Sequence, residues 1–158
     1  MDIEKVVPII NKISIFGGLT EKELCGLFRL LARVDYEADE IIFEQGDEPT
    51  HIYIVRSGLV KIIADIVNEP LELAAVEPGQ CFGETALIGI QPHSASAVAV
   101  TRAELIVLTG DALLSLFEKD IRLFSKLTLN IAREACRRLH KTDQTMLHYV
   151  QMQNHPRK

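Results

Sequence analysis

The chain has 158 residues, of which 47% are hydrophobic and 25% are charged, and its formal net charge is −5. This length is typical of one domain with a core of its own, and the hydrophobic fraction excludes a disordered chain. The three cysteines, Cys25, Cys81 and Cys136, are odd in number and far apart, which excludes a disulfide scaffold and favours a reducing compartment.

The sequence has no pattern of export or membrane insertion. Its first residues lack the basic and apolar regions of a signal peptide, and no apolar run approaches the roughly 20 residues of a membrane span. We therefore expect a cytoplasmic protein with no membrane partner.

Charge is distributed unevenly along the chain. Residues 1–119 carry 9 basic and 19 acidic side chains, whereas residues 120–158 carry 8 basic and 3 acidic ones. The first part therefore has a net charge of −10 and the last part a net charge of +5. The acidic part argues against a broad nucleic-acid surface there, and the basic end needs an explanation of its own.

The N-terminal part has helical patterns. Thr20 and Glu23 have the spacing of a capping box, in which each side chain bonds to the backbone N–H of the other residue. Leucine and phenylalanine then recur at helical intervals from Leu24 to Leu31. We expect a helical N-terminal segment over residues 1–33.

The middle of the chain has short β-rich runs separated by turn residues. Ser57-Gly58 predicts a β-hairpin turn between two of these runs, and residues 68–70 predict another turn. Many short strands at such spacing are typical of a closed barrel or jelly roll, which leaves few exposed edges. We expect the barrel over residues 34–109, with strands at residues 41–43, 52–55, 59–63, 71–76, 95–100 and 104–108.

Helical periodicity returns after Gly110. One helix is expected over residues 111–119, and a longer one runs from about residue 121 to residue 146 or beyond. These C-terminal helices occupy about residues 110–150, followed by a frayed tail at residues 151–158. The predicted fold is therefore mainly β with flanking helices: one domain over residues 1–158, an antiparallel jelly-roll β-barrel with N-terminal helices and a long C-terminal helix.

The most informative segment is residues 78–88. Gly83 has no side chain, so a ligand can approach the backbone closely there. The N–H groups at the start of a short helix beginning at Thr85 would face an anion. The carboxylate of Glu84 would accept hydrogen bonds from hydroxyl groups. Together these features describe a site for the sugar and phosphate of a nucleotide, and the alternative is an ordinary turn followed by a solvated acid.

The residues around this segment resemble a known family. Residues 82–88 and the following Pro92-His93-Ser94 are similar to the phosphate-binding cassette of the cyclic nucleotide-binding domain family. That family includes kinase regulatory subunits, the catabolite activator protein and cyclic-nucleotide-gated channels. Residues 15–20, 40–47 and 52–60 also resemble its hallmark segments, so the resemblance covers about residues 13–139 in the expected order.

The resemblance implies roles for the residues of this segment. Gly83 would pass close to the ribose, Glu84 would accept from the ribose 2′-hydroxyl, and the amides near Thr85 and Ala86 would meet the cyclic phosphate. Ser94 would lie across the phosphate. The implied ligand is cyclic AMP, with cyclic GMP as the alternative, in a pocket whose base site is lined by residues 71–76 and closed by the last helix.

One position departs from the family pattern. The phosphate-binding arginine of the family falls on His93, and histidine lacks both the permanent charge and the forked donors of arginine. Two outcomes follow: the pocket still binds a cyclic nucleotide with a protonated His93, or the domain has become a nucleotide-free interaction or dimerisation module. The first predicts that affinity falls as the pH rises from 6 to 8 and that His93→Arg tightens binding.

No residue pattern predicts an enzyme. His51 and His93 are isolated, so they do not form the clustered ligands of a metal site. Cys25 and Cys136 lie on helical stretches and Cys81 in an apolar strand, which gives no support for a cysteine nucleophile. We expect no catalytic residues, no metal and no catalytic cofactor.

The basic C-terminal residues Arg133, Arg137, Arg138 and Lys141 have three explanations. They could form the solvated face of a helix, flank a homodimer interface along the C-terminal helix, or contact nucleic acid. Transcription factors of the family carry a helix-turn-helix of several dozen residues after this helix, and the dozen residues after Met146 are too few for one. We therefore expect a homodimer and an unidentified output protein as partners, without direct DNA binding.

Overall fold

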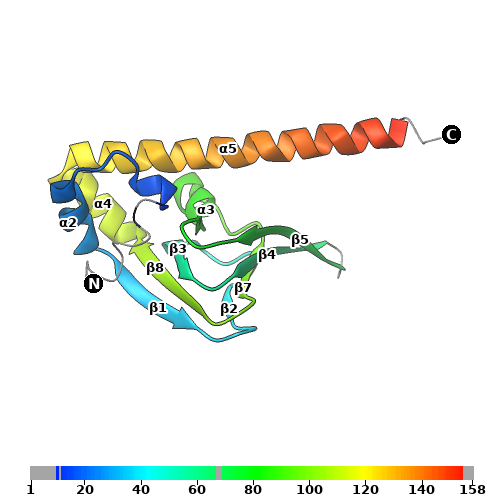
Figure 1. Cartoon of the computed structure of the whole chain (residues 1–158), viewed down its shortest axis with the longest axis horizontal. Helices are drawn as coiled ribbons and strands as arrows, with labels where there is room; N and C mark the ends of the chain where they lie inside the picture. The colour runs from blue at the N-terminus through cyan, green and yellow to red at the C-terminus, as the bar shows by residue number, and fades with distance from the viewer. Residues whose placement is uncertain (1–9, 11, 67–68, 155–158) are drawn as a thin grey trace.

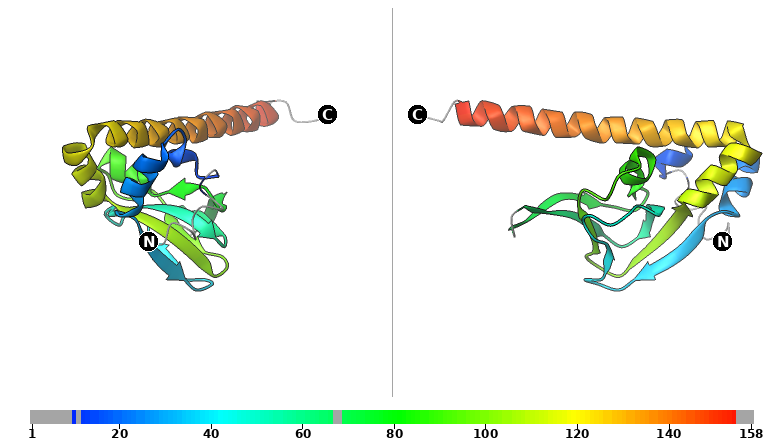
Figure 2. Two further views of the ribbon diagram at one scale, coloured as in Figure 1. Left: turned by 60° about the vertical axis from the view of Figure 1, so that its left-hand side comes forward. Right: turned by 180° about the vertical axis from the view of Figure 1, so that it is seen from behind.

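The chain folds into a β-rich body that a long helix crosses on one side (Figures 1 and 2). The computed structural model describes residues 10, 12–66 and 69–154. It confirms the predicted fold class of antiparallel sheets with helices at both ends. The strands are β1 (Ala32–Tyr36), β2 (Ile41–Phe43), β3 (His51–Ser57), β4 (Val60–Ile66), β5 (Glu69–Val76), β6 (Cys81–Phe82), β7 (Ser96–Ala99) and β8 (Ala103–Thr109).

The strands form two four-stranded antiparallel sheets, in the orders β1-β8-β3-β6 and β2-β7-β4-β5. Successive side chains of a strand point to opposite faces, and β3 uses both faces. Tyr53 and Val55 belong to a core that both sheets share, whereas Ile52 and Ile54 belong to a second core shared with the helices. The first sheet is therefore buried on both sides, which explains why β3 reads as a continuous apolar run.

The helices gather on the outer face of the first sheet (Figure 1). The predicted capping box is confirmed: the backbone N–H of Thr20 donates to Glu23 Oε2 at 2.7 Å, and that of Glu23 donates to Thr20 Oγ1 at 3.3 Å. The helical segments are the 3₁₀ turn η2 (Ser14–Phe16), α2 (Glu21–Phe28), α3 (Glu84–Gly89), α4 (Gly110–Lys119) and α5 (Ile121–Asn154).

Helix α5 has an anchored half and a free half. In the anchored half, Leu123, Leu127 and Ile131 are buried in the helical core, and Asn130 Nδ2 donates to the carbonyls of Ile15 and Gly17. In the other half, the C-terminal turns extend past the body (Figures 1 and 2). None of the helices among the described residues is both long and apolar enough to cross a lipid bilayer.

The predicted hairpin at Ser57-Gly58 is wrong. This turn joins β3 to β4, which lie in different sheets, so it is a corner between the sheets. Gly58 has a φ of +88°, and a Cβ there would lie 2.4 Å from the carbonyl oxygen of Arg102. Leu59 N–H also donates to Thr101 Oγ1 at 3.1 Å, and this hydrogen bond holds the corner against the β7–β8 turn.

Several predicted boundaries also change. The helical segment expected over residues 1–33 ends earlier because β1 begins at Ala32, an edge strand absent from the prediction. Glu69 and Pro70, expected in a turn, pair with Ile66 and Asp65 as the start of β5. The last helix continues to Asn154, past the expected end near residue 150, and residues 155–158 of the expected tail lie outside the described residues.

Candidate functional site

Gly83 stands where strand β6 turns into helix α3. Strand β6 pairs with β3 through Phe82 and Tyr53, which fixes the position of the glycine. Gly83 is the N-cap residue of α3 and has a φ of +80°. A Cβ at this position would lie 3.1 Å from both the carbonyl oxygen of His51 and Tyr53 Cδ2. Both the conformation and the space therefore require glycine here.

Glu84, the first residue of α3, is fully buried and forms an ion pair with Arg138 of helix α5. Apart from this ion pair, neither carboxylate oxygen has a hydrogen-bond partner among the described residues. A buried carboxylate is costly unless it is paired and hydrogen-bonded, so an oxygen without a second partner is unusual. The alternative that Glu84 is a solvated acid is therefore wrong.

His93 lies on the loop that follows α3, with its backbone held on both sides. Its N–H donates to the carbonyl of Asp47 at 2.9 Å, and its carbonyl accepts from the N–H of Gly46 at 2.8 Å. The imidazole is buried and stacks on Phe43, with ring centroids 3.7 Å apart and an interplanar angle of 11°. Burial lowers the pKa of His93 below its usual value, and the charge of Asp47 opposes this only in part. The ring is therefore mostly neutral at pH 7.

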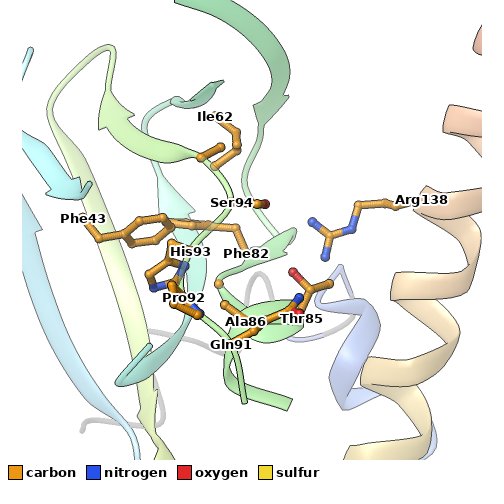
Figure 3. A pocket seen from close by; sticks show the side chains of 12 residues that line it. Phe43, Ile62, Phe82, Thr85, Ala86, Gln91, Pro92, His93, Ser94 and Arg138 are labelled. Carbon is orange, nitrogen blue, oxygen red and sulfur yellow. The ribbon is translucent and has the colours of Figure 1, made fainter. Parts of the chain in front are cut away.

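These elements enclose a small pocket (Figure 3). Arg138 reaches into it from α5 toward Thr85 and Ala86, and the stacked pair Phe43 and His93 forms the opposite wall (Figure 3). The cavity volume is about 90 Å³, well below the roughly 300–1,000 Å³ of typical small-molecule sites. The lining residues are Phe43, Ile62, Phe82, Gly83, Thr85, Ala86, Gln91, Pro92, His93, Ser94, Ala95 and Arg138.

The structure brings the six predicted site residues to one place. Gly83, Thr85, Ala86, His93 and Ser94 line the pocket, whereas Glu84 lies beneath Arg138, outside the lining.

Sequence reasoning missed Arg138 as a pocket residue and grouped it with three other basic residues, for which a solvated helix face was one of three explanations. Its neighbours on α5 do fit that description, because Arg137 pairs with Glu134 and Arg133 donates to Asn130.

The residues expected to line the base site, 71–76, also differ from those observed. Most of β5 is exposed, and Leu71 and Leu73 are about half exposed. The apolar residue that lines the pocket from the β4–β5 hairpin is Ile62 of β4.

The described residues include no group of three or more His, Cys, Asp or Glu side chains that could hold a metal ion. Burial raises the pKa of the Cys81 thiol to about 11, which keeps it protonated at neutral pH. Cys25 and Cys136 are free and exposed on α2 and α5.

A family model described as "cyclic nucleotide-binding domain" matches residues 33–120, from β1 to the end of α4. The chain belongs to the cyclic nucleotide-binding domain family. The matched region contains the Gly83–Glu84 step and the loop of His93, so the resemblance predicted from the sequence is confirmed.

Two relatives are similar to much of the chain. It is 34% identical over 130 residues to the cyclic AMP receptor protein of Thermus thermophilus, covering 82% of this chain and 58% of that protein. It is 35% identical over 108 residues to a cAMP-dependent protein kinase regulatory subunit of Dictyostelium discoideum, covering 68% of this chain and 33% of that one. The chain therefore spans less than two thirds of these relatives.

A solved structure of the family has the same fold. The crystal structure of a cyclic nucleotide-binding domain from Methylobacillus flagellatus is 27% identical, has a TM-score of 0.82 and covers 92% of this chain and 83% of its own. The family's sheets and long C-terminal helix are thus present here.

Proposed function

We propose that the chain is a regulatory module that binds a cyclic nucleotide, cyclic AMP first and cyclic GMP as the alternative. The observation that carries this proposal is the Gly83–Glu84 step, with a buried carboxylate oxygen that lacks a partner. A ribose hydroxyl would satisfy that oxygen, and Gly83 leaves the backbone open to close approach. The names of the bacterial and Dictyostelium relatives, which refer to cyclic AMP, support the choice of ligand.

The remaining site residues would hold the phosphate. Thr85, Ala86 and Ser94 line the pocket around the space beside Gly83, where backbone amides and the Ser94 hydroxyl could donate to phosphate oxygens. No catalytic step is part of this proposal. Ligand binding would bias the position of α5, because Arg138 on that helix already contacts the pocket.

A second candidate function is a module that no longer binds nucleotide and acts through protein contacts. The stacking and burial of His93 favour it, because they remove the charge that the family places at this position. The two candidates predict different results in a binding measurement.

Cyclic AMP is expected to bind more tightly as the pH falls from 8 to 5.5. A bound phosphate favours the imidazolium form, so binding takes up a proton only where the free His93 is neutral and the bound one is charged. Asp47 supports that charge and Arg138, across the pocket, opposes it. Because burial lowers the pKa of His93 in the free chain, the pH-dependent range extends to lower pH than the 6 to 8 expected from the sequence.

Calorimetric titration with cyclic AMP and cyclic GMP at pH 5.5, 7 and 8 measures this dependence. His93→Gln is the control, and its affinity should not vary with pH over this range. Undetectable binding at every pH, both in the original chain and in His93→Arg, would favour the nucleotide-free candidate.

We also propose that the chain forms a homodimer through α5 and passes its signal to a separate output protein. Exposed residues recur along α5 at alternating intervals of three and four, the spacing of a coiled-coil interface. Leu139 and Met146 are the most exposed of its large hydrophobic members, at 62% and 66%. The series is Leu129, Ala132, Cys136, Leu139, Asp143, Met146 and Val150.

Replacing both Leu139 and Met146 by glutamate is expected to convert a dimer into a monomer, because like charges would meet across the interface. Sedimentation velocity measures the change. Leu114→Glu, on an exposed site of α4, is the matched control and should remain dimeric. A chain that is monomeric before any substitution would contradict the homodimer.

A further inference from the structure

Arg138 is the fixed positive charge of the pocket. Apart from it, the described residues that line the pocket are neutral side chains and His93, whose pKa is lowered by burial. A guanidinium is charged at every physiological pH and presents a planar fork of donors that fits phosphate oxygens. Arg138 thus brings to the pocket, from helix α5 outside the barrel, the guanidinium that position 93 lacks.

Arg138 also covers Glu84. The carboxylate of Glu84 is fully buried, although Gly83 and Thr85 on either side of it line the pocket. The ion pair with Arg138 occupies the carboxylate, and the cavity beside it is small, about 90 Å³. A ligand can therefore reach Glu84 only if the guanidinium moves.

We propose that Arg138 is the phosphate-binding residue of this pocket and that ligand binding changes its partner. The guanidinium passes from the carboxylate of Glu84 to the phosphate, and Glu84 accepts hydrogen bonds from the ribose hydroxyls in its place. This inference rests on the proposed function and deepens it. Every charge keeps a partner in both states, so the exchange does not leave a bare buried carboxylate.

The exchange would link the pocket to the free half of α5. Ile131 is the last residue of α5 in the buried core, and Arg138 follows it by two helical turns, about 10 Å along the axis. A change of partner at Arg138 therefore acts on the part of the helix that extends past the body (Figure 1).

The test compares neighbouring arginines on the same helix. Arg138→Leu is expected to weaken the binding of cyclic AMP by roughly ten- to a hundredfold, the range for loss of a hydrogen bond to a charged group. Arg137→Leu removes the same charge from an exposed residue outside the pocket, and its affinity should stay within about twofold. Calorimetry gives the affinities, and thermal melting followed by circular dichroism verifies folding.

A rescue variant makes the result specific to the phosphate. Adding His93→Arg to Arg138→Leu should restore most of the lost affinity, because it returns a guanidinium to the opposite wall. If Arg138→Leu alone fails to fold, the neutral pair Glu84→Gln with Arg138→Gln and the charge-preserving Arg138→Lys replace it. The lysine variant keeps Glu84 and a positive charge but loses the planar fork of donors, and it is expected to bind more weakly than the original chain.

Equal or tighter binding by Arg138→Leu would overturn the inference, because Arg138 would then only cover Glu84. A failure of the rescue would also overturn it, since the loss would not concern the phosphate charge. Absence of binding by the original chain and by His93→Arg would instead contradict the proposed function itself.

Discussion

Replacing His93 by arginine is expected to tighten the binding of cyclic AMP by about ten- to a hundredfold. A forked, charge-assisted contact to phosphate contributes about 1.5–3 kcal/mol more than the single N–H of a mostly neutral imidazole. The backbone at position 93 is held by hydrogen bonds to Gly46 and Asp47, so the new side chain starts from the same place. Guanidinium groups also stack on aromatic rings, which lets arginine take the place of the imidazole on Phe43.

Calorimetry at pH 7.5 measures this effect at a pH where His93 of the free chain is mostly neutral. His140→Arg is the control, because His140 is exposed on α5, outside the pocket lining, and it adds the same charge to the chain. An affinity equal in His93→Arg and in the control would contradict the assignment of position 93 to the phosphate.

Local patterns in the sequence were sufficient for most of the fold. The Thr20 and Glu23 capping box depends on residues three apart, and β3 is marked by a continuous run of β-branched and aromatic residues. Such features are decided by neighbours along the chain. That Gly83, Thr85 and Ala86 lie together at the pocket was likewise predictable, because they are close neighbours in the sequence.

What the sequence did not reveal depends on distant parts of the chain. A glycine turn at Ser57-Gly58 has the same local pattern whether it closes a hairpin or a corner, and the β7–β8 turn above Gly58 decides between them. Strand β1 was missed because its outward residues are charged: Arg33 forms ion pairs with Asp35 and with Glu104 of β8.

Arg138 was missed for the same kind of reason. Its local pattern matches that of Arg137, a solvated helix residue, and only the packing of α5 on the body places it over Glu84. The buried state of His93 is also a tertiary effect, which the sequence alone could not separate from a surface position.

Leu127→Ala is expected to lower the free energy of unfolding by about 2–5 kcal/mol, the cost of a cavity at a fully buried leucine. Leu127 is 0% exposed and lies in the core that joins α5 to the first sheet and the other helices. Domains of this size are stable by about 5–15 kcal/mol, so the loss is a large fraction of the total. Urea denaturation measures it, with Leu114→Ala on the exposed face of α4 as control, for which a change within about 0.5 kcal/mol is expected.

The same variant tests how α5 is coupled to the pocket. Lys126 pairs with Glu23 of α2 at 2.8 Å and Asn130 bonds to the carbonyls of Ile15 and Gly17, so Leu127 lies at the centre of the attachment of α5. A loosened attachment leaves Arg138 less well placed over the pocket, and cyclic AMP binding should weaken together with stability. Equal losses of stability in Leu127→Ala and Leu114→Ala would contradict this attachment, and α5 could not then transmit a change at Arg138 to the body.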